Sequence, residues 1–268
     1  GIARAYHEEP MLYGFGQAPE LPDGQAVNYD QGGQLYVKRY PYSVYGLAFA
    51  LTKVLVEDGD HIRIGSTYSK HLAQSMIETL ETVCANHLNR AFNASYVGGD
   101  GSALVVNNHV DIAGGAAGAN SRSNLLTTSA ALSQTSLEQM LIQIRQAEDP
   151  RGKKIRLTPK KLVVAPGNML TAEVLLKSVL RAGTNNNDLN PVKSMGLLSD
   201  VAVLSRLTSA TAWFVQTDAP EGIKVLWRRK TEKAMEGDFE TDSVRYKSTM
   251  RFGSGWTDWR AMFGTSGT

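Results

Sequence analysis

Hydrophobic and polar positions alternate strictly over residues 244–251 of this chain. A period of two is typical of a β-strand that buries one of its faces. The side chains that point to the other face are all cationic or hydroxylic: Arg245, Lys247, Thr249 and Arg251. We therefore expect a strand that packs one face within the chain and offers the other face to acidic groups of a partner.

Aromatic residues continue from this strand to the end of the chain. Trp256 and Trp259 are two of the four tryptophans, and Phe263 follows them. Terminal segments usually fray unless they are packed against something. We expect residues 256–264 to pack into a core or into an interface.

Two further apolar runs, at residues 35–40 and 45–51, are strand-like and follow the turn-prone residues 30–33, which predicts a hairpin. Five of the ten tyrosines gather in this region: Tyr29, Tyr36, Tyr40, Tyr42 and Tyr45. Because tyrosine combines apolar area with a polar tip, two interpretations stay open. The hairpin is either an ordinary edge of one chain or a surface that another subunit covers.

The longest helical pattern covers residues 66–93, where apolar residues recur every three or four positions. Ser66 or Thr67 is available as its amino-terminal cap. At about 1.5 Å per residue, such a helix is long enough to act as a spine of the fold. Residues 1–26 contain three prolines and no sustained period, so we expect an extended arm. Residues 96–124 are a long polar excursion.

Helical and strand patterns are mixed in the second half of the chain. One helix is expected from Ser136, where Ser136 and Gln139 fit a capping box, to just before Pro150. Another is expected over residues 171–182, stopped by Gly183. Short strands are expected at residues 162–165, 201–204, 212–215 and 223–227. The whole pattern predicts an α+β fold.

Composition places the chain among folded globular proteins. It has 268 residues, 42% hydrophobic and 20% charged, which is enough to build a sizeable core. A formal net charge of +2 creates no general field that would gather nucleic acid or an anionic membrane. The single cysteine, Cys84, excludes an internal disulfide framework, and no apolar run approaches the roughly 18 residues needed to span a bilayer. The chain starts at Gly1 without a methionine, so we expect a processed or truncated start.

Few residue patterns indicate catalysis. The glycine-rich residues 97–102 lack a following GK[ST], so a turn is favoured over a phosphate site. Asp58, Asp60 and His61 are candidate hydrolase or metal residues, but an acidic turn that starts a helix is favoured. Cys84 lies in the apolar stripe of the long helix, which indicates a small buried hydrophobe.

Two basic clusters, within residues 151–161 and at residues 228–230, contain no acidic residue. Solvated loop charge is the simplest interpretation. Contacts to an acidic neighbour or to nucleic-acid phosphates are the alternatives. Neither cluster carries a motif that reads bases.

The order of these elements, together with several short motifs, resembles a tailed-bacteriophage major capsid protein of the Hong Kong 97 fold. More narrowly, the chain resembles the Mu-like major head subunit group. The residues that carry the resemblance are Tyr45-Gly46-Leu47-Ala48-Phe49 with Glu57-Asp58, Asp100-Gly101 with His109, Pro159 with residues 162–166, Trp213-Phe214, Arg251, and Asp258-Trp259-Arg260.

The resemblance implies an arm at residues 1–26 and an extended hairpin loop at 27–58. It implies a peripheral domain at 59–150 and 231–268, which contains the spine helix, and an axial domain at 151–230. Copies would form the hexamers and pentamers of an icosahedral shell around packaged DNA. Such a subunit would assemble in the host cytoplasm into a virion, without a cofactor, a metal, enzymatic activity or a membrane. Decoration, scaffold and portal proteins would be further partners.

The sequence also predicts where copies contact each other. The candidate intersubunit residues are Tyr36, Lys38, Arg39, Tyr40, Arg245, Arg251 and Arg260. Reversing the charges among them is expected to block assembly and leave the monomer folded. Two other functions remain as alternatives: a hydrolase that uses Asp58, Asp60 and His61, and a nucleic-acid-binding module that uses residues 151–161.

Overall fold

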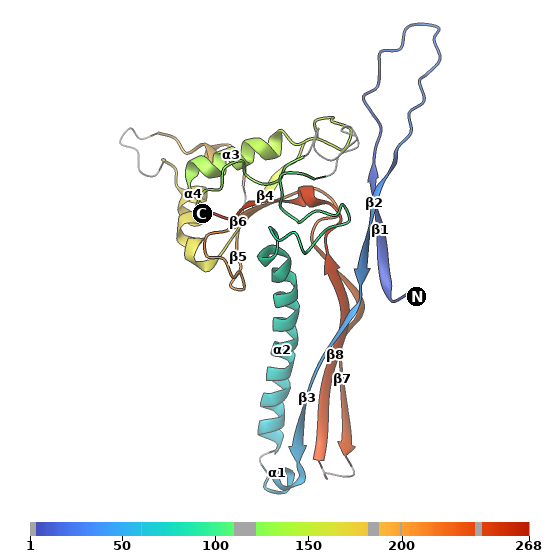
Figure 1. The fold of residues 1–268 in the computed structure, drawn as a ribbon. Helices are drawn as coiled ribbons and strands as arrows, with labels where there is room; N and C mark the ends of the chain where they lie inside the picture. The colour runs from blue at the N-terminus through green and yellow to red at the C-terminus, as the bar shows by residue number, and fades with distance from the viewer. Residues whose placement is uncertain are drawn as a thin grey trace. The chain divides into compact units, whose positions relative to one another are not determined.

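The structure is a computed structural model that describes residues 4–59, 61–109, 122–181, 188–198, 200–238 and 243–267. Helices and strands are mixed along the chain, as the sequence predicts (Figure 1). The chain divides into two compact units. The first consists of residues 1–7, 40–84 and 224–255, and the second of residues 8–39, 85–223 and 256–268.

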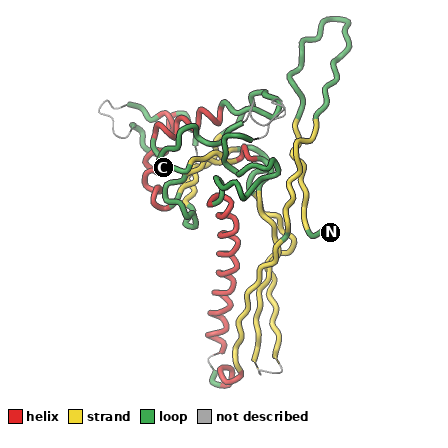
Figure 2. The backbone as a smooth tube through the Cα atoms, in the orientation of Figure 1, coloured by secondary structure: helices red, strands yellow, loops and turns green. Residues whose placement is uncertain are grey.

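The first unit contains an antiparallel three-stranded sheet in the order β3-β8-β7 (Figure 2). Its strands are β3 (Ser43–Thr52), β8 (Ser243–Gly255) and β7 (Lys224–Asp238). Met250 and Ser248 on β8 are buried, whereas Arg245 and Lys247 are exposed. The alternation predicted for residues 244–251 is therefore confirmed.

The long helix packs on the buried face of this sheet. It is α2 (His61–Asn89), and the short helix α1 (Lys53–Glu57) precedes it. Met76, on α2, forms a buried cluster with Met250 and Phe252 of β8. The predicted cap at Ser66 or Thr67 is wrong, because the helix begins several residues earlier, at His61. The predicted end at residue 93 is also late, since residues 90–92 already form a turn.

One buried side chain on this face lacks a partner. Ser248 is fully buried, and its Oγ has no hydrogen-bond partner among the residues described above. An unsatisfied buried hydroxyl is costly, so we expect Ser248→Ala to raise the free energy of unfolding by about 1 kcal/mol in urea denaturation. Ser43→Ala, at an exposed position of the same sheet, is the matched control and should change it by less than about 0.5 kcal/mol. A destabilised Ser248→Ala variant would contradict this expectation.

The second unit is built on a four-stranded sheet in the order β5-β4-β6-β9. Its strands are β5 (Asp200–Val203), β4 (Pro159–Val164), β6 (Trp213–Thr217) and β9 (Met262–Thr265). The helical elements of this unit are α3 (Gln134–Arg145), η1 (Pro166–Asn168), α4 (Met169–Lys177), α5 (Pro191–Ser194) and η2 (Trp259–Ala261). Buried residues of α3 and α4 form one core with Leu162, Trp213 and Phe263 of the sheet.

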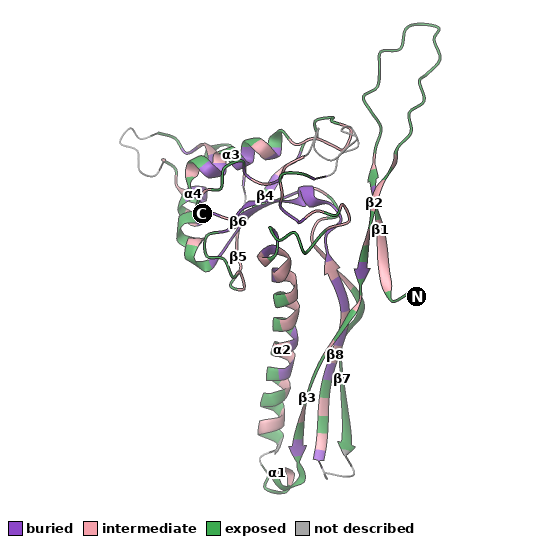
Figure 3. Ribbon diagram, in the orientation of Figure 1, coloured by how far each residue is buried: buried purple, intermediate pink, exposed green. Residues whose placement is uncertain are grey.

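The carboxyl-terminal segment contributes to two buried clusters of this unit, Phe263 to the core above and Trp256 to a second one with Phe214. Trp256, Trp259 and Phe263 are all buried, and β9 pairs with β6 over four residues. The expectation that residues 256–264 pack into a core is confirmed. Figure 3 shows this segment in the colour of buried residues, in contrast to the exposed β7.

The predicted hairpin of residues 35–40 and 45–51 is wrong. These residues lie in β2 (Gly33–Pro41) and β3, but β2 pairs with β1 (Tyr6–Tyr13), and β3 pairs with β8. Only Tyr42 separates β2 from β3, so the chain runs on without the turn that a hairpin needs. The arm expected at residues 1–26 is in part a strand, and the loop of the real hairpin is residues 14–32.

Two helix boundaries also differ from the predictions. Helix α3 begins earlier, because Ser133 is its cap: the Ser133 side chain accepts the Ser136 N–H, and the Ser136 side chain accepts the Ser133 N–H. The capping box predicted at Ser136 and Gln139 is therefore wrong. Helix α4 ends at Lys177, because Ser178 takes an extended conformation. Gly183, its predicted end, lies outside the described residues.

Candidate functional site

The exposed face of the β3-β8-β7 sheet has a central row of cations. Arg245 and Lys247 are both exposed on β8. Lys247 has Ala48 on one side and Ala234 on the other, so its neighbours across the strands are small. A groove of about 360 Å³ runs here, lined by Ala48, Ala234, Met235, Glu236, Gly237, Arg245 and Lys247. Small neighbours leave the Lys247 side chain accessible to an acidic partner, whereas Arg245 is exposed but has Glu236 of β7 directly opposite.

Arg251 continues the cationic row along β8. Its side chain is half-buried, and its Nε is buried without a hydrogen bond to any residue that the structure describes. Its neighbour across the strands on β7 is another cation, Arg229. Like charges directly opposite each other are unfavourable unless a carboxylate compensates them. Glu232 on β7 lies 3.4 Å from Arg229, so a carboxylate of the same sheet already compensates that charge.

The candidate residues on β2 already have partners within the chain. In the second unit, Tyr36 Oη donates to the Thr257 carbonyl at 2.8 Å, and Lys38 Nζ donates to the Val97 carbonyl at 2.8 Å. Burial lowers the pKa of the Lys38 ammonium, while the nearby Asp100 opposes that shift. Lys38 Nζ also lies 5.2 Å from the centre of the Trp256 ring. These contacts fix β2 in place and leave little of Lys38 for a neighbour.

The other two β2 residues differ in exposure. Arg39 donates to Glu8 on β1 at 2.8 Å, but its side chain is still 62% exposed. Tyr40 belongs to the first unit and is fully buried, with the ring of His7 6.3 Å away. Arg39 is therefore accessible to a second copy, and Tyr40 is not.

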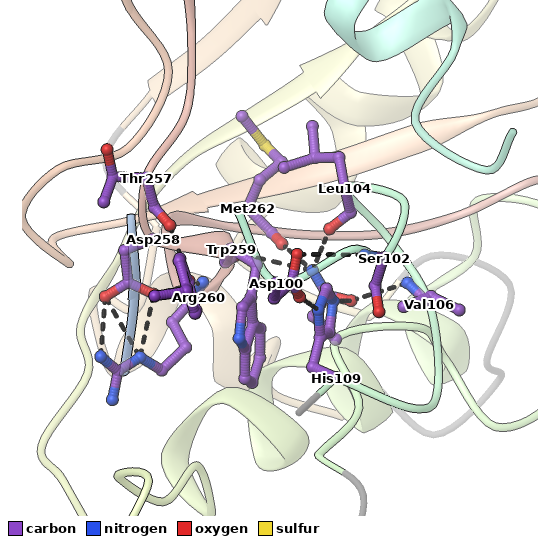
Figure 4. A network of polar contacts seen from close by, with 12 residues as sticks. Asp100, Ser102, Leu104, Val106, His109, Thr257, Asp258, Trp259, Arg260 and Met262 are labelled. Atoms are coloured by element: carbon purple, nitrogen blue, oxygen red, sulfur yellow. Dashed lines mark hydrogen bonds and ion pairs between the residues drawn. The ribbon is translucent and has the colours of Figure 1, made fainter. Parts of the chain in front are cut away.

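Arg260 is buried against its own chain. Its guanidinium makes three hydrogen bonds with the carboxylate of Asp258, at 2.9–3.1 Å, and the Arg260 N–H makes another (Figure 4). The Arg260 and Asp258 side chains are only 10% and 2% exposed. The expected intersubunit ion pair of Arg260 is thus replaced by a pair within the chain. The physical reason is that Asp258 also caps the short helix η2 and so lies within reach of Arg260.

Next to this pair lies a buried network centred on His109 (Figure 4). His109 Nδ1 lies 2.6 Å from Asp100 Oδ2, and its Nε2 lies 3.0 Å from Asn124 Oδ1. The ring stacks on Trp259, with centroids 4.2 Å apart. Four segments therefore meet at this histidine: the 98–105 turn, residue 109, residue 124 and the carboxyl-terminal segment.

Asn124 fixes the direction of its hydrogen bond with this histidine. Its Nδ2 donates to the carbonyls of Leu104 and Met262, at 2.7 and 2.8 Å, and its Oδ1 accepts the Val106 N–H at 2.9 Å. The amide can therefore have only one orientation, and His109 Nε2 must donate to Oδ1. The other ring nitrogen, Nδ1, faces the Asp100 carboxylate at 2.6 Å. The site is a buried polar joint that ties these segments together.

Sequence reasoning did not identify this network as a site. Asp100 and His109 entered only as positions that carry the family resemblance, and Asn124 was not singled out. The three residues lie in or beside a polar stretch without hydrophobic periodicity, so no period could place them together. The pairing of Asp100 with His109 in one family motif was the only available signal.

The hydrolase alternative has little structural support. Asp58 ends the short helix α1, where its N–H donates to the Val54 carbonyl. Asp60 and the side chain of His61 lie outside the described residues. Among the residues the structure covers, no three His, Cys, Asp or Glu side chains gather as a metal site.

Two further titratable groups are poor catalysts. Burial raises the pKa of the Cys84 thiol, which therefore stays protonated and weakly nucleophilic. Burial, and then the charges of Lys38 and Arg90, lower the pKa of His87 to about 4. Gly98 N–H donates to the Ser102 carbonyl at 2.7 Å, so the glycine-rich residues form a turn, as predicted.

The basic segment 151–161 is largely neutralised by carboxylates of the same chain. Arg151 pairs with Asp30, Lys154 with Glu148, and Lys161 with Asp200. A nucleic-acid site needs cations that are available to phosphates. This pairing favours the simpler interpretation of solvated loop charge. None of the helices in the described ranges has the length and apolar character to cross a membrane.

A family model and several solved structures match this chain. The sequence pattern of the phage capsid protein family matches residues 38–264. No curated protein matches the chain. The fold is similar to that of the capsid of cyanophage P-SCSP1u, with a TM-score of 0.57 and 11% identity over 98% of this chain and 83% of that chain. It is also similar to a structure from Microbacterium phage Oxtober96 (TM-score 0.56, 9% identity, 98% and 86% coverage).

A third similar structure is the capsid of a native GTA particle, with a TM-score of 0.53 and 11% identity over 98% of this chain and 85% of that chain. These similarities confirm the predicted Hong Kong 97-type fold. The narrower Mu-like group stays a prediction.

Proposed function

The chain belongs to the phage capsid protein family, and we propose that it forms the head by assembling as hexamers and pentamers into an icosahedral shell around viral DNA. The observation that carries this proposal is the loop between β1 and β2. Every residue from 14 to 32 is exposed, with Phe15, Val27 and Tyr29 at 62%, 66% and 99%. Covering such side chains with a neighbouring copy would gain about 25 cal/mol per Å².

A second exposed apolar surface supports the same proposal. It lies on α4 and the segments beside it, and we call it the α4 patch: Leu170, Val174, Val179, Leu189 and Met195. Their exposed fractions range from 48% to 72%. Scattered apolar residues are normal on a surface, but several on adjoining segments indicate an interface. The α4 patch falls within residues 151–230, which we propose as the axial domain.

The cationic row on β8 is the proposed polar contact. Arg245, Lys247 and Arg251 offer positive charge, and the tip of the 14–32 loop carries the exposed acids Glu20 and Asp23. We infer that this tip, on one copy, lies against the cationic row of the next. Arg39 is a further candidate, since its side chain remains largely exposed.

The domain boundaries we propose follow the strand pairing. Because β1 pairs with β2, the extended loop is better assigned to the hairpin of residues 6–41 than to residues 27–58. Residues 59–150 and 231–268 remain the proposed peripheral domain. The subunit is proposed to act by structure, without catalysis or a cofactor, and to assemble in the host cytoplasm. Its near-neutral charge suits a wall that encloses DNA without gripping it.

Assembly of the purified full chain tests this function. We expect concentrated protein to form closed shells, seen by negative-stain electron microscopy and as a large species in light scattering. Scaffold, decoration or portal proteins, which are further proposed partners, would change shell yield and size. Protein that stays monomeric at high concentration, alone and with a scaffold protein, would contradict the proposal.

Charge reversal locates the contacts within the same assay. Arg245→Glu is expected to abolish most shell formation, because it places like charge against the loop tip of the neighbour. Lys70→Glu makes the same change at an exposed position of α2 and should assemble normally. If Glu20→Lys and Asp23→Lys restore assembly to the Arg245→Glu variant, the acidic loop tip is the partner of Arg245. Circular dichroism shows whether each variant subunit is folded.

A further inference from the structure

The 14–32 loop is not held by burial, since all of its side chains are exposed. Its order must come from polar contacts at its base. Without contacts at its base, a loop of this length would sample many orientations. The corresponding conformational entropy would then be lost when the loop binds a neighbour. The contacts at the base therefore decide how the tip is presented.

Those contacts converge on one residue, Arg151. Its Nη1 and Nη2 donate to the two carboxylate oxygens of Asp30, at 2.5 and 3.2 Å, and Nη2 also donates to the Gln31 carbonyl at 2.9 Å. On the other side of the loop, the Gly16 N–H donates to the same carboxylate at 2.6 Å. The guanidinium carbon lies 5.3 Å from the centre of the Tyr13 ring, at the end of β1. One guanidinium thus joins both ends of the loop.

The turn that carries Arg151 is itself well defined. Asp149 Oδ1 accepts the N–H groups of Arg151 and Lys153, both at 2.9 Å. Gly152 takes a left-handed conformation, with φ of 79°, which closes the turn. Lys153 Nζ adds a hydrogen bond of 3.0 Å to the Phe15 carbonyl. The base of the loop is fastened to a rigid support in the same unit.

This pair is a poor source of global stability. The Arg151 and Asp30 side chains are 26% and 46% exposed, and ion pairs in such positions add little to the free energy of unfolding. Chiefly through its hydrogen bonds, Arg151 lowers the pKa of Asp30 to about 2, so the pair is ionised at neutral pH. Its effect is therefore local: the pair restricts the conformations of the 14–32 loop.

We propose that Arg151 is a positioning residue for assembly, which clamps the base of the 14–32 loop through Asp30 so that the tip meets a neighbouring copy in one orientation. This inference rests on the proposed function. The clamp acts through geometry as well as charge, because a guanidinium binds a carboxylate through two parallel hydrogen bonds and an ammonium does not.

Hydrogen exchange on the unassembled chain tests the clamp directly. In Arg151→Gln, we expect the Gly16 amide to exchange roughly fivefold faster, while the thermal midpoint changes little. Lys154→Gln removes a charge from the same turn without touching the loop, so it should leave the Gly16 amide unchanged. An unchanged Gly16 exchange rate in Arg151→Gln would overturn the clamp.

Shell formation tests its role. Arg151→Gln is expected to lose most shell assembly at a concentration where Lys154→Gln and the unmodified chain assemble fully, and Arg151→Lys is expected to recover only part of it. If the loop loosens but shells form normally, the positioning role is wrong and the proposed function stands. If the unmodified chain forms no shells with or without a scaffold, the proposed function fails, whereas the exchange result still reports on the clamp.

Discussion

Replacing Asn124 by alanine is expected to lower the free energy of unfolding by about 4 kcal/mol, a large effect for a single polar side chain. The Asn124 side chain is fully buried and bridges backbone groups of two distant segments. Its loss leaves the Val106 N–H and the carbonyls of Leu104 and Met262 buried without these bonds. It also removes the acceptor of His109 Nε2. Urea denaturation of the unassembled subunit measures the effect.

Two further variants sharpen this prediction. Asn124→Asp keeps the shape but turns an acceptor toward the Leu104 and Met262 carbonyls, so it should be at least as destabilising as alanine. Asn28→Ala makes the alanine change at an exposed position and should shift stability by less than about 0.5 kcal/mol. A loss below about 1 kcal/mol in Asn124→Ala would show that other groups satisfy these backbone atoms.

Strands with one buried face were the most predictable part of the fold. β8 was recognised from its alternation, because Met250 and Ser248 are buried while Arg245 and Lys247 are not. β7 was recognised only at its start, near residues 224–227. From residue 227 to 237 every side chain of β7 is exposed, so no burial pattern marks the strand. It exists because its backbone pairs with β8, and sequence periodicity carries no signal for that.

Strand partners were less predictable than strands. The runs at 35–40 and 45–51 are real strands, but their partners are β1 and the distant β8. Neighbours in sequence are usually paired, and that rule favoured a hairpin here. The single residue between β2 and β3 was the available warning, since a hairpin needs at least two.

The exposure of the charged candidate residues was also predictable only where a strand pattern covered them. Arg245 was correctly expected to be exposed, because it lies on the polar face of an alternating strand. Arg260 lies outside any such pattern, in a segment where eleven consecutive residues are buried, from Gly255 to Thr265. Only the acidic residue two positions earlier signalled that this arginine would be paired within the chain.

That buried pair gives the second large expected effect. Asp258→Ala is expected to cost about 3–5 kcal/mol of unfolding free energy, because it leaves the Arg260 guanidinium in a site only 10% exposed without its carboxylate. The Arg260 N–H, which Asp258 also accepts at 2.9 Å, loses its partner as well. We expect the variant to unfold at a lower urea concentration and to form no shells, because Arg260 lies within η2 and β9 follows it directly.

The double variant Asp258→Ala with Arg260→Met distinguishes two costs of losing Asp258: the unpaired charge of Arg260 and the lost cap of η2. Removing both charges replaces a buried ion pair by apolar contact, and such changes are often neutral, so most of the lost stability should return. Glu173→Ala breaks the exposed pair with Lys177 on α4 and should cost less than about 0.5 kcal/mol. If the double variant were as unstable as Asp258→Ala, the carboxylate would matter through its cap of η2 and not through the charge of Arg260. Recovery would instead show that the unpaired guanidinium dominates the cost, and hence that Arg260 serves the fold of each subunit before any contact between copies.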